Sequence, residues 1–236
     1  MSKLYKTKFL LSESNAKTIK NGMRTKIMYL APHKLANGKV NLCPNASKGC
    51  IESCLNTAGR GVMSNVSEGR INKTLWFIHD KVDFLTKLIK ELSNFNKLMG
   101  RKKTIGLVRL NGTSDLDFAA IIKNKLGVDI LSYKNLKYYD YTKNLDRAIK
   151  VAKSNINYTL TYSWNEESDK DLVIAAMKQG VNVAIVFRNE LPDTWHGFKV
   201  IDGDKADDLM LYNKSVVLGL KAKGKAKKDN SGFVLE

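Results

Sequence analysis

The 236-residue sequence has few prolines, which interrupt helices and strands, and few cysteines, which can cross-link a chain: there are three of each. Histidine is equally scarce, with three residues. Proline is scarce and no Gly/Ser-rich stretch occurs, so no linker is expected to divide the chain, and one domain is predicted. The few histidines stand in no recognisable Ser-His-Asp or Cys-His order, so the sequence gives no support for a hydrolase of that kind.

Long apolar runs are also missing. No run approaches the roughly 20 residues that cross a membrane as a helix. The N-terminus, MSKLYKTKFLLSES, lacks the apolar stretch of a secretory signal peptide. The sequence therefore predicts a soluble cytoplasmic protein without a membrane partner. In that reducing compartment cysteines stay as thiols, so a disulfide framework is not expected.

Acidic residues are outnumbered, because 23 Asp and Glu face 40 Lys and Arg, which gives a formal net charge of +17. A surface this basic attracts polyanions, and nucleic acid is the partner we predict. The alternative interpretation is that the excess lysine only keeps the protein in solution.

Part of the excess charge lies near the C-terminus, in the run KAKGKAKK. We predict a single α/β domain over residues 1–220 and a basic, flexible tail over residues 221–236. The lysines expected to contact phosphates are Lys143, Lys221, Lys223, Lys225, Lys227 and Lys228. A solvated terminus that binds nothing is the alternative for the tail.

Apolar periodicity predicts helices that alternate with strands. The helices are expected over residues 64–79, 82–99, 118–126, 144–153 and 169–179, with Gly127 as the C-cap of the third. The strands are expected over residues 39–42, 104–110, 136–141, 156–163, 181–187 and 198–201. This order is typical of a parallel sheet. It predicts a partial (β/α) barrel of about six parallel strands, or a doubly wound sheet, after an N-terminal extension over residues 1–40.

The three cysteines, Cys43, Cys50 and Cys54, stand close together in a loop over residues 43–60, spaced Cys-x6-Cys-x3-Cys. Three thiolates suit a soft metal or an iron–sulfur cluster. A [4Fe–4S] cluster held by three cysteines would keep one iron free for a cosubstrate. Zinc is an alternative, with His33 or His79 as the fourth ligand that zinc requires. Unmetallated thiols are the third interpretation.

Polar residues follow several of the predicted strands. Ligands of parallel α/β folds bind at the carboxyl ends of strands, so these residues are candidates for cofactor binding. They are Asn111, Ser114, Asp115, Tyr141, Ser163, Trp164, Arg188 and Asp202. Structural alternatives remain open: a helix N-cap for Ser114 and Asp115, strand packing for Tyr141, and an Asp-Gly turn for Asp202. Trp164 suits an ordinary interface and Arg188 an ion pair.

The segments CPNASKGCIESC, YDYTKNLDRA and VIDGDKADD…GLKAKGKAKK resemble phage-encoded proteins of the gene product eighty-eight-like family. The cysteine-rich opening of that family is similar to that of radical S-adenosylmethionine enzymes. The usual motif of those enzymes is Cys-x3-Cys-x2-Cys with an aromatic residue beside the third cysteine. Here the spacing differs, and Ser53 and Leu55 flank Cys54.

This resemblance implies an enzyme of the host cytoplasm with S-adenosylmethionine on the open iron of the cluster. A reduced cluster would donate an electron, and the cosubstrate would fragment to a radical that abstracts hydrogen from nucleic acid or a nucleotide-derived molecule. The alternative is a non-catalytic nucleic-acid-binding phage protein, in which zinc or a cluster has a structural role.

Overall fold

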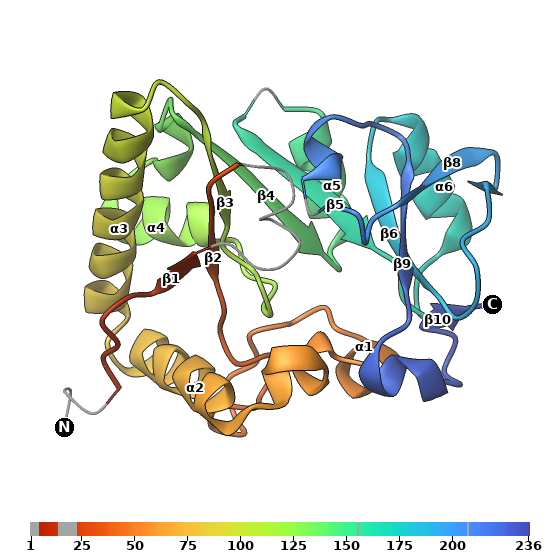
Figure 1. Cartoon of the computed structure of the whole chain (residues 1–236), viewed down its shortest axis with the longest axis horizontal. Helices are drawn as coiled ribbons and strands as arrows, with labels where there is room; N and C mark the ends of the chain where they lie inside the picture. Colours follow the sequence, from red (N-terminus) through yellow and green to blue (C-terminus); the bar gives the residue numbers. More distant parts are fainter. Residues whose placement is uncertain (1–4, 14–22, 155, 207) are drawn as a thin grey trace.

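The computed structural model describes residues 5–13, 23–154, 156–206 and 208–236. They form a ten-stranded sheet in the order β1-β2-β3-β4-β5-β6-β9-β8-β7, with β10 beside β6 (Figure 1). The strands are β1 Leu11–Glu13, β2 Thr25–Met28, β3 Gly106–Arg109, β4 Leu136–Thr142, β5 Tyr158–Ser163, β6 Asn182–Phe187, β7 Thr194–Trp195, β8 Phe198–Asp202, β9 Val217–Lys221 and β10 Val234–Leu235.

The sheet is mostly parallel. All pairs from β2 to β8 along its order are parallel, and so is the pair of β10 with β6. Only the outermost strands, β1 and β7, run antiparallel to their neighbours. Among the described strands β1 and β7 are the two open edges, so the expected α/β class is confirmed and closure toward a barrel is not.

The helices are α1 Lys48–Glu52, α2 Ser64–His79, α3 Lys81–Arg101, α4 Phe118–Leu126, α5 Leu145–Ala152 and α6 Lys170–Lys178. All but the short α1 begin and end within about half a turn of the predicted bounds. Gly127 ends α4 in the left-handed conformation, with φ of 67°, as predicted for a C-cap. In the described ranges no helix combines the length and the apolar character needed to cross a membrane.

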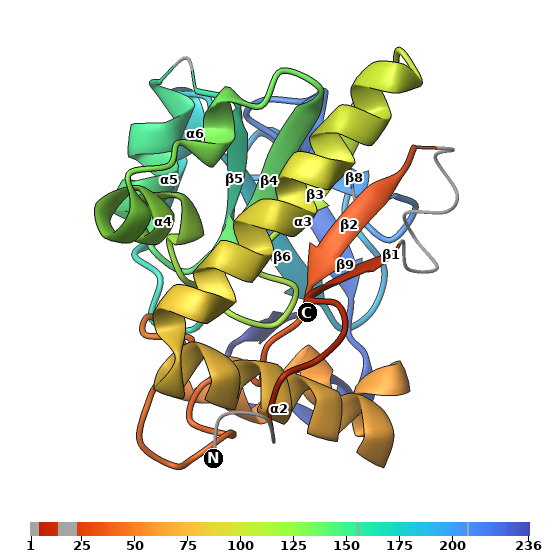
Figure 2. The ribbon, with the colours of Figure 1, turned by 90° about the vertical axis from the view of Figure 1, so that its left-hand side faces the viewer.

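Four crossover helices, α3 to α6, cover one face of the sheet. Strands β2 to β6 are added in chain order, and right-handed crossovers then place the helices between them on the same face. Figure 2 shows α3, α4, α5 and α6 on that face. Phe84 and Leu88 of α3 pack with Val108 of β3, and Val173 and Met177 of α6 pack in a second cluster around β5 and β6.

The opposite face of the central strands is buried too. Leu107, Tyr139, Ala184 and Leu218 alternate with the helix-facing residues of their strands and pack against Met210 of the short helix η4 Leu209–Leu211. Burial on both faces explains why β6 reads as an almost continuous apolar run.

The N-terminal third of the chain contributes to the sheet itself. Strand β2, in the predicted N-terminal extension, pairs with β3 in parallel and so belongs to the main sheet. The strand predicted over residues 39–42 is absent from the structure. Those residues form a loop in which the backbone N–H of buried Leu42 donates to the carbonyl of His33 at 2.9 Å.

The C-terminal residues, predicted as a basic tail over 221–236, also contribute elements to the sheet. Strand β9 inserts between β6 and β8, the short helix η5 Gly224–Lys228 follows it, and β10 pairs with β6. Arg188 fastens this segment, because its guanidinium donates to the carboxylate of Glu236 at 2.7 Å and to the carbonyl of Lys227 at 2.8 Å.

Candidate functional site

A cavity of about 420 Å³ lies at the carboxyl ends of the parallel strands. Its wall on the sheet side is formed by residues that end or follow β3, β4, β5 and β9, namely 109 and 111–115, 141–143, 163, and 220–221. Its other wall is formed by the cysteine loop, residues 43–60, and by Arg70 of α2. In Figure 1 these parts and η5 lie along the lower edge, across the strand ends.

All three cysteines line this cavity, which we call the cysteine cavity. Cys50 lies on α1, whose N-cap Ser47 accepts a hydrogen bond from the backbone N–H of Cys50 at 3.2 Å. Glu166, in the loop after β5, accepts from the backbone N–H of Gly49 at 2.6 Å and from the Ser47 hydroxyl at 2.8 Å. These bonds tie α1 to the sheet and direct Cys50 toward the strand ends.

The three thiols share an environment poor in water. Burial, together with the nearby thiols of Cys54 and Cys50, raises the pKa of Cys43 to about 12. Burial also raises the pKa values of Cys50 and Cys54. The thiols are therefore close enough to interact electrostatically, and without a bound metal ion they hold their protons at neutral pH. A metal that binds them has to displace those protons.

Each sulfur has a neighbour that favours its thiolate form. The backbone N–H of His33 donates to Cys43 Sγ at 3.4 Å. The ammonium of Lys143 counteracts burial and lowers the pKa of Cys50. A backbone hydrogen bond at Asn56, and then the charge of Arg70, act in the same direction on the pKa of Cys54. Donors and cations around ligand sulfurs are typical of metal–thiolate centres.

The described residues contain no group of three His, Cys, Asp or Glu side chains arranged to hold one metal ion. Of the two histidines considered as zinc ligands, His33 donates its backbone N–H to Cys43 Sγ, and the ring of His79 stacks on Tyr5 with centroids 5.8 Å apart. The zinc alternative therefore gains no support. A cluster makes a different demand, because each cysteine binds a different iron and the sulfurs need not converge on one point.

The polar loop after β3 lines the cysteine cavity, but it uses its side chains internally. The Asn111 amide donates to the carbonyl of Leu116 at 2.9 Å and accepts from the Ser114 hydroxyl at 2.9 Å. The N-cap of α4 is Asp117, which accepts from the backbone N–H of Ala120 at 3.0 Å. Ser114 and Asp115 are therefore not the cap, and Asn111 and Ser114 shape the wall.

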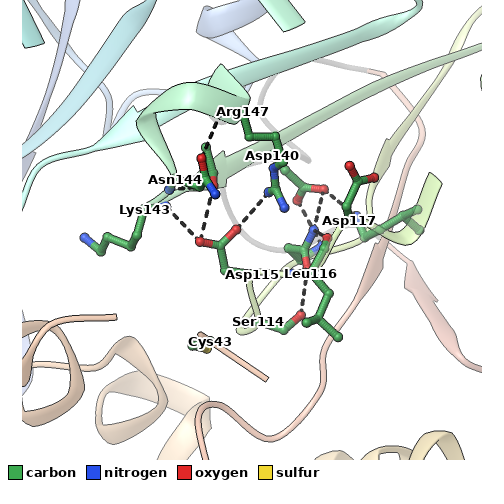
Figure 3. A network of polar contacts seen from close by, with 12 residues as sticks. Cys43, Ser114, Asp115, Leu116, Asp117, Asp140, Lys143, Asn144 and Arg147 are labelled. Atoms are coloured by element: carbon green, nitrogen blue, oxygen red, sulfur yellow. Dashed lines mark hydrogen bonds and ion pairs between the residues drawn. The ribbon is translucent and has the colours of Figure 1, made fainter. Parts of the chain in front are cut away.

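Asp115 connects this loop to the next two elements. Its carboxylate accepts from the Arg147 guanidinium at 2.8 Å, from the backbone N–H of Lys143 at 2.8 Å and from the Thr142 hydroxyl at 3.3 Å. Figure 3 shows Asp115 between Lys143 and Arg147, with Cys43 beyond the loop. This buried ion pair holds the end of β4 and the start of α5 against the cavity wall.

Lys143 was predicted to contact nucleic-acid phosphate, and the structure places it in the wall of the cysteine cavity. Its ammonium donates to the hydroxyl of Ser163 at 2.8 Å and to the carbonyls of Ser163 and Trp164 at 3.2 and 3.0 Å. Burial lowers its pKa, and the neighbouring Cys50 and Asp115 oppose that shift. The hydrogen bonds to Ser163 therefore hold the Lys143 ammonium beside the thiols.

Three predicted cofactor residues do not line the cavity. The indole ring of Trp164 packs edge-on against Trp195, with ring centroids 5.4 Å apart. Arg188 fastens the C-terminal segment, and Asp202 accepts from the backbone N–H of Asp204 at 2.9 Å in a local turn. These positions match the structural alternatives of an interface residue and an Asp-Gly turn.

A family model described as Gene product 88 matches residues 9–236. The chain belongs to this family. The match confirms the resemblance to the phage family, whereas no comparison supports the likeness to radical S-adenosylmethionine enzymes. No curated protein and no solved structure matches the chain.

Arg109 and Phe233 are among the cavity residues that were not predicted as site residues from the sequence. Arg109 lies at the end of β3, with its guanidinium 4.8 Å from the centre of the Tyr141 ring and 3.7 Å from the Asp140 carboxylate. A charged residue in the otherwise apolar strand TIGLVRL was a usable signal. Phe233 of the C-terminal segment lines the cavity and lies under the Lys143 ammonium at 4.8 Å. No local pattern in the sequence indicates that position.

Gly49→Ala is expected to destabilise the packing of α1, the helix that carries Cys50. A Cβ atom at Gly49 would overlap Ser231 Oγ and lie 2.8 Å from both Glu166 Oε2 and Phe233 Cβ. Overpacking of this kind costs about 1–3 kcal/mol, which lowers Tm by roughly 2–12 °C in a domain of this size. Thermal unfolding followed by circular dichroism measures the change. Gly69→Ala in α2 is the control, since a Cβ there meets nothing within 4 Å; equal Tm values for the two variants would contradict the packing.

Proposed function

We propose that this chain is an iron–sulfur protein in which Cys43, Cys50 and Cys54 hold a [4Fe–4S] cluster. The fourth iron would be open to S-adenosylmethionine, as in a radical S-adenosylmethionine-like enzyme that acts on nucleic acid or a nucleotide-derived molecule. The observation that carries the proposal is that all three thiols line one cavity at the carboxyl ends of the parallel strands.

The donor set fits such a cluster. Thiolates are the usual ligands of iron–sulfur clusters, and three of them satisfy three of the four irons. When bound, the cluster would supply the electron that activates the cosubstrate. The chain itself would stabilise the negative charge on the sulfurs through the His33 N–H, the Lys143 ammonium and the Arg70 guanidinium.

The sheet side of the cavity would receive the cosubstrate. The side chains of Asn111, Ser114 and Asp115 already have internal partners, so their proposed role is to shape and stiffen this wall. Tyr141 lines the cavity, and its ring is a candidate to stack on the adenine of the cosubstrate. The Ser163 hydroxyl positions the Lys143 ammonium.

Electron paramagnetic resonance of the anaerobic, reduced protein tests the open iron. Addition of S-adenosylmethionine is expected to change the signal of the reduced cluster, because ligation of one iron alters its electronic structure. A cluster signal that stays the same at millimolar cosubstrate would contradict the open site and favour a fully ligated centre.

The second candidate function is a non-catalytic nucleic-acid-binding protein with a structural metal. One observation favours it: the basic residues 221–228, here called the basic segment, lie against the cysteine loop. A Cβ atom on Gly224 would lie 2.9 Å from Ala58 Cβ. This candidate predicts a steeply salt-dependent affinity for nucleic acid and no response to the cosubstrate.

A further inference from the structure

The cysteine cavity carries an excess of positive charge. Its described lining includes six cationic side chains, Arg60, Arg70, Arg109, Lys143, Lys221 and Lys223, and two carboxylates, Asp115 and Asp204. Cations concentrated in a partly enclosed site focus the potential and raise the local concentration of anions. Which of these charges already have a partner decides what the cavity can bind.

Most of the six cations already interact with groups of the protein. Lys223 pairs with Asp204 at 2.7 Å, and Arg109 lies 3.7 Å from Asp140. The other lining carboxylate, Asp115, pairs with Arg147 from outside the cavity lining. Lys143 and Arg70 lie close enough to Cys50 and Cys54 to lower the pKa values of those thiols. Lys143 and Arg70 would therefore stabilise the negative charge of a bound cluster.

Two cations are left over. Neither Arg60 nor Lys221 has an ion pair among the described residues, and both side chains are exposed at the cavity. Arg60 lies in the short helix η2 Gly59–Val62, and Lys221 ends β9. The approach of Gly224 to Ala58 and Thr57 joins the two segments, so that both cations belong to one rim, which we call the basic rim.

We propose that the basic rim, Arg60 with Lys221, binds a phosphate group of the substrate. Two unpaired cations suit the charge of about −1.5 to −2 on a phosphate monoester, and the guanidinium fork matches phosphate oxygens in a bidentate way. Exposed Lys225, Lys227 and Lys228 continue the positive charge along η5, which extends the same attraction to a strand with successive phosphates. The proposal rests on the proposed function only in that the substrate enters the cysteine cavity.

The test uses the full chain and a fluorescein-labelled single-stranded DNA 12-mer, with binding followed by anisotropy over a salt series. The double variant Arg60→Gln/Lys221→Gln is expected to bind about tenfold or more weakly at low salt. The slope of log affinity against log salt should become shallower by about 0.7, since the rim is proposed to bind one phosphate group and each phosphate contact to a single strand contributes about 0.7.

The control variant Lys150→Gln/Lys178→Gln removes the same charge from exposed lysines of α5 and α6. It is expected to bind like the wild type, and equal losses in both double variants, or no binding by the wild type, would overturn the proposal. Competition by a nucleoside monophosphate separates the sources of phosphate. Displacement of the strand indicates a free nucleotide, and no displacement indicates a polymer; either result supports the rim if the double variant loses the interaction.

Iron analysis of the same samples separates this proposal from the proposed function. Loss of affinity in the rim variant of a protein without iron would support the basic rim and contradict the cluster. Full iron content together with unchanged affinity in the rim variant would support the cluster and contradict the basic rim.

Discussion

Replacing any one of Cys43, Cys50 and Cys54 by serine is expected to reduce the iron content of anaerobically purified protein from about four atoms per chain to below about one. A serine hydroxyl is a hard and weakly acidic ligand, whereas cluster iron requires thiolates. Each cysteine holds a different iron in the proposed centre, so the two that remain cannot retain the cluster. Colorimetric iron analysis and the visible absorption spectrum measure the loss.

Ser53→Ala is the matched control for the cysteine variants. Ser53 lies beside Cys54 in the same loop and is buried, and within the described part of the chain its hydroxyl donates one long hydrogen bond, to Asp229 at 3.4 Å. Its removal should leave the iron content unchanged. If a cysteine variant keeps the full iron content, that cysteine is not a ligand, and the cluster assignment would have to be abandoned at that position.

Asp115→Ala is expected to lower the free energy of unfolding by about 3–5 kcal/mol, the usual cost of removing one partner of a buried ion pair. The loss leaves the Arg147 guanidinium, 14% exposed, without its carboxylate. It also leaves the Lys143 N–H and the Thr142 hydroxyl without their acceptor. Urea unfolding followed by circular dichroism gives the value, because the midpoint shifts in proportion to the stability that is lost.

Glu13→Gln provides the contrast for Asp115. Glu13 also forms an ion pair, with Lys26, but its side chain is 61% exposed. Exposed pairs contribute about 0–1 kcal/mol, so this variant should unfold almost like the wild type. Similar small losses for both variants would contradict the view that the Asp115 network holds the cavity wall together.

The helices could be predicted because their signals are local. In α3 the buried residues Phe84, Leu85, Leu88, Leu92, Phe95 and Met99 recur at steps of mostly three and four, which is the pattern of one helical face. Strand β6 has an apolar run of the right length, and β4 and β5 are rich in the aromatic and β-branched residues that favour strands. The parallel α/β class follows from the alternation of these two kinds of segment.

Strands β9 and β10 could not be predicted in the same way. Strand β9 is immediately followed by the lysine-rich basic segment, and β10 spans only two residues. Their place in the sheet depends on pairing with β6, 30 or more residues earlier in the chain. Non-local pairing of this kind leaves no periodicity within a short window. Pairing with β6 therefore brings into the sheet residues that the sequence alone did not assign to it.

The candidate site shows the same division. The grouping of three cysteines in one short loop was visible in the sequence, and so were polar residues at the ends of strands. Whether a polar side chain faces a ligand or a neighbour depends on contacts across the fold. Lys143 bonds to Ser163 and Trp164, and Asp115 to Arg147. Those partners lie 20 to 32 positions along the chain.

The most direct test of the cluster is the iron and acid-labile sulfide content of the wild-type chain, purified and reconstituted without oxygen, together with its absorption spectrum. The structure-based proposal predicts about four irons and four sulfides per chain and a broad absorption near 400 nm that reduction bleaches, as for a [4Fe–4S] centre. Stoichiometric zinc, or a colourless protein without iron after reconstitution, would contradict it. The cysteine cavity would then belong to a basic binding protein whose loop has a structural role.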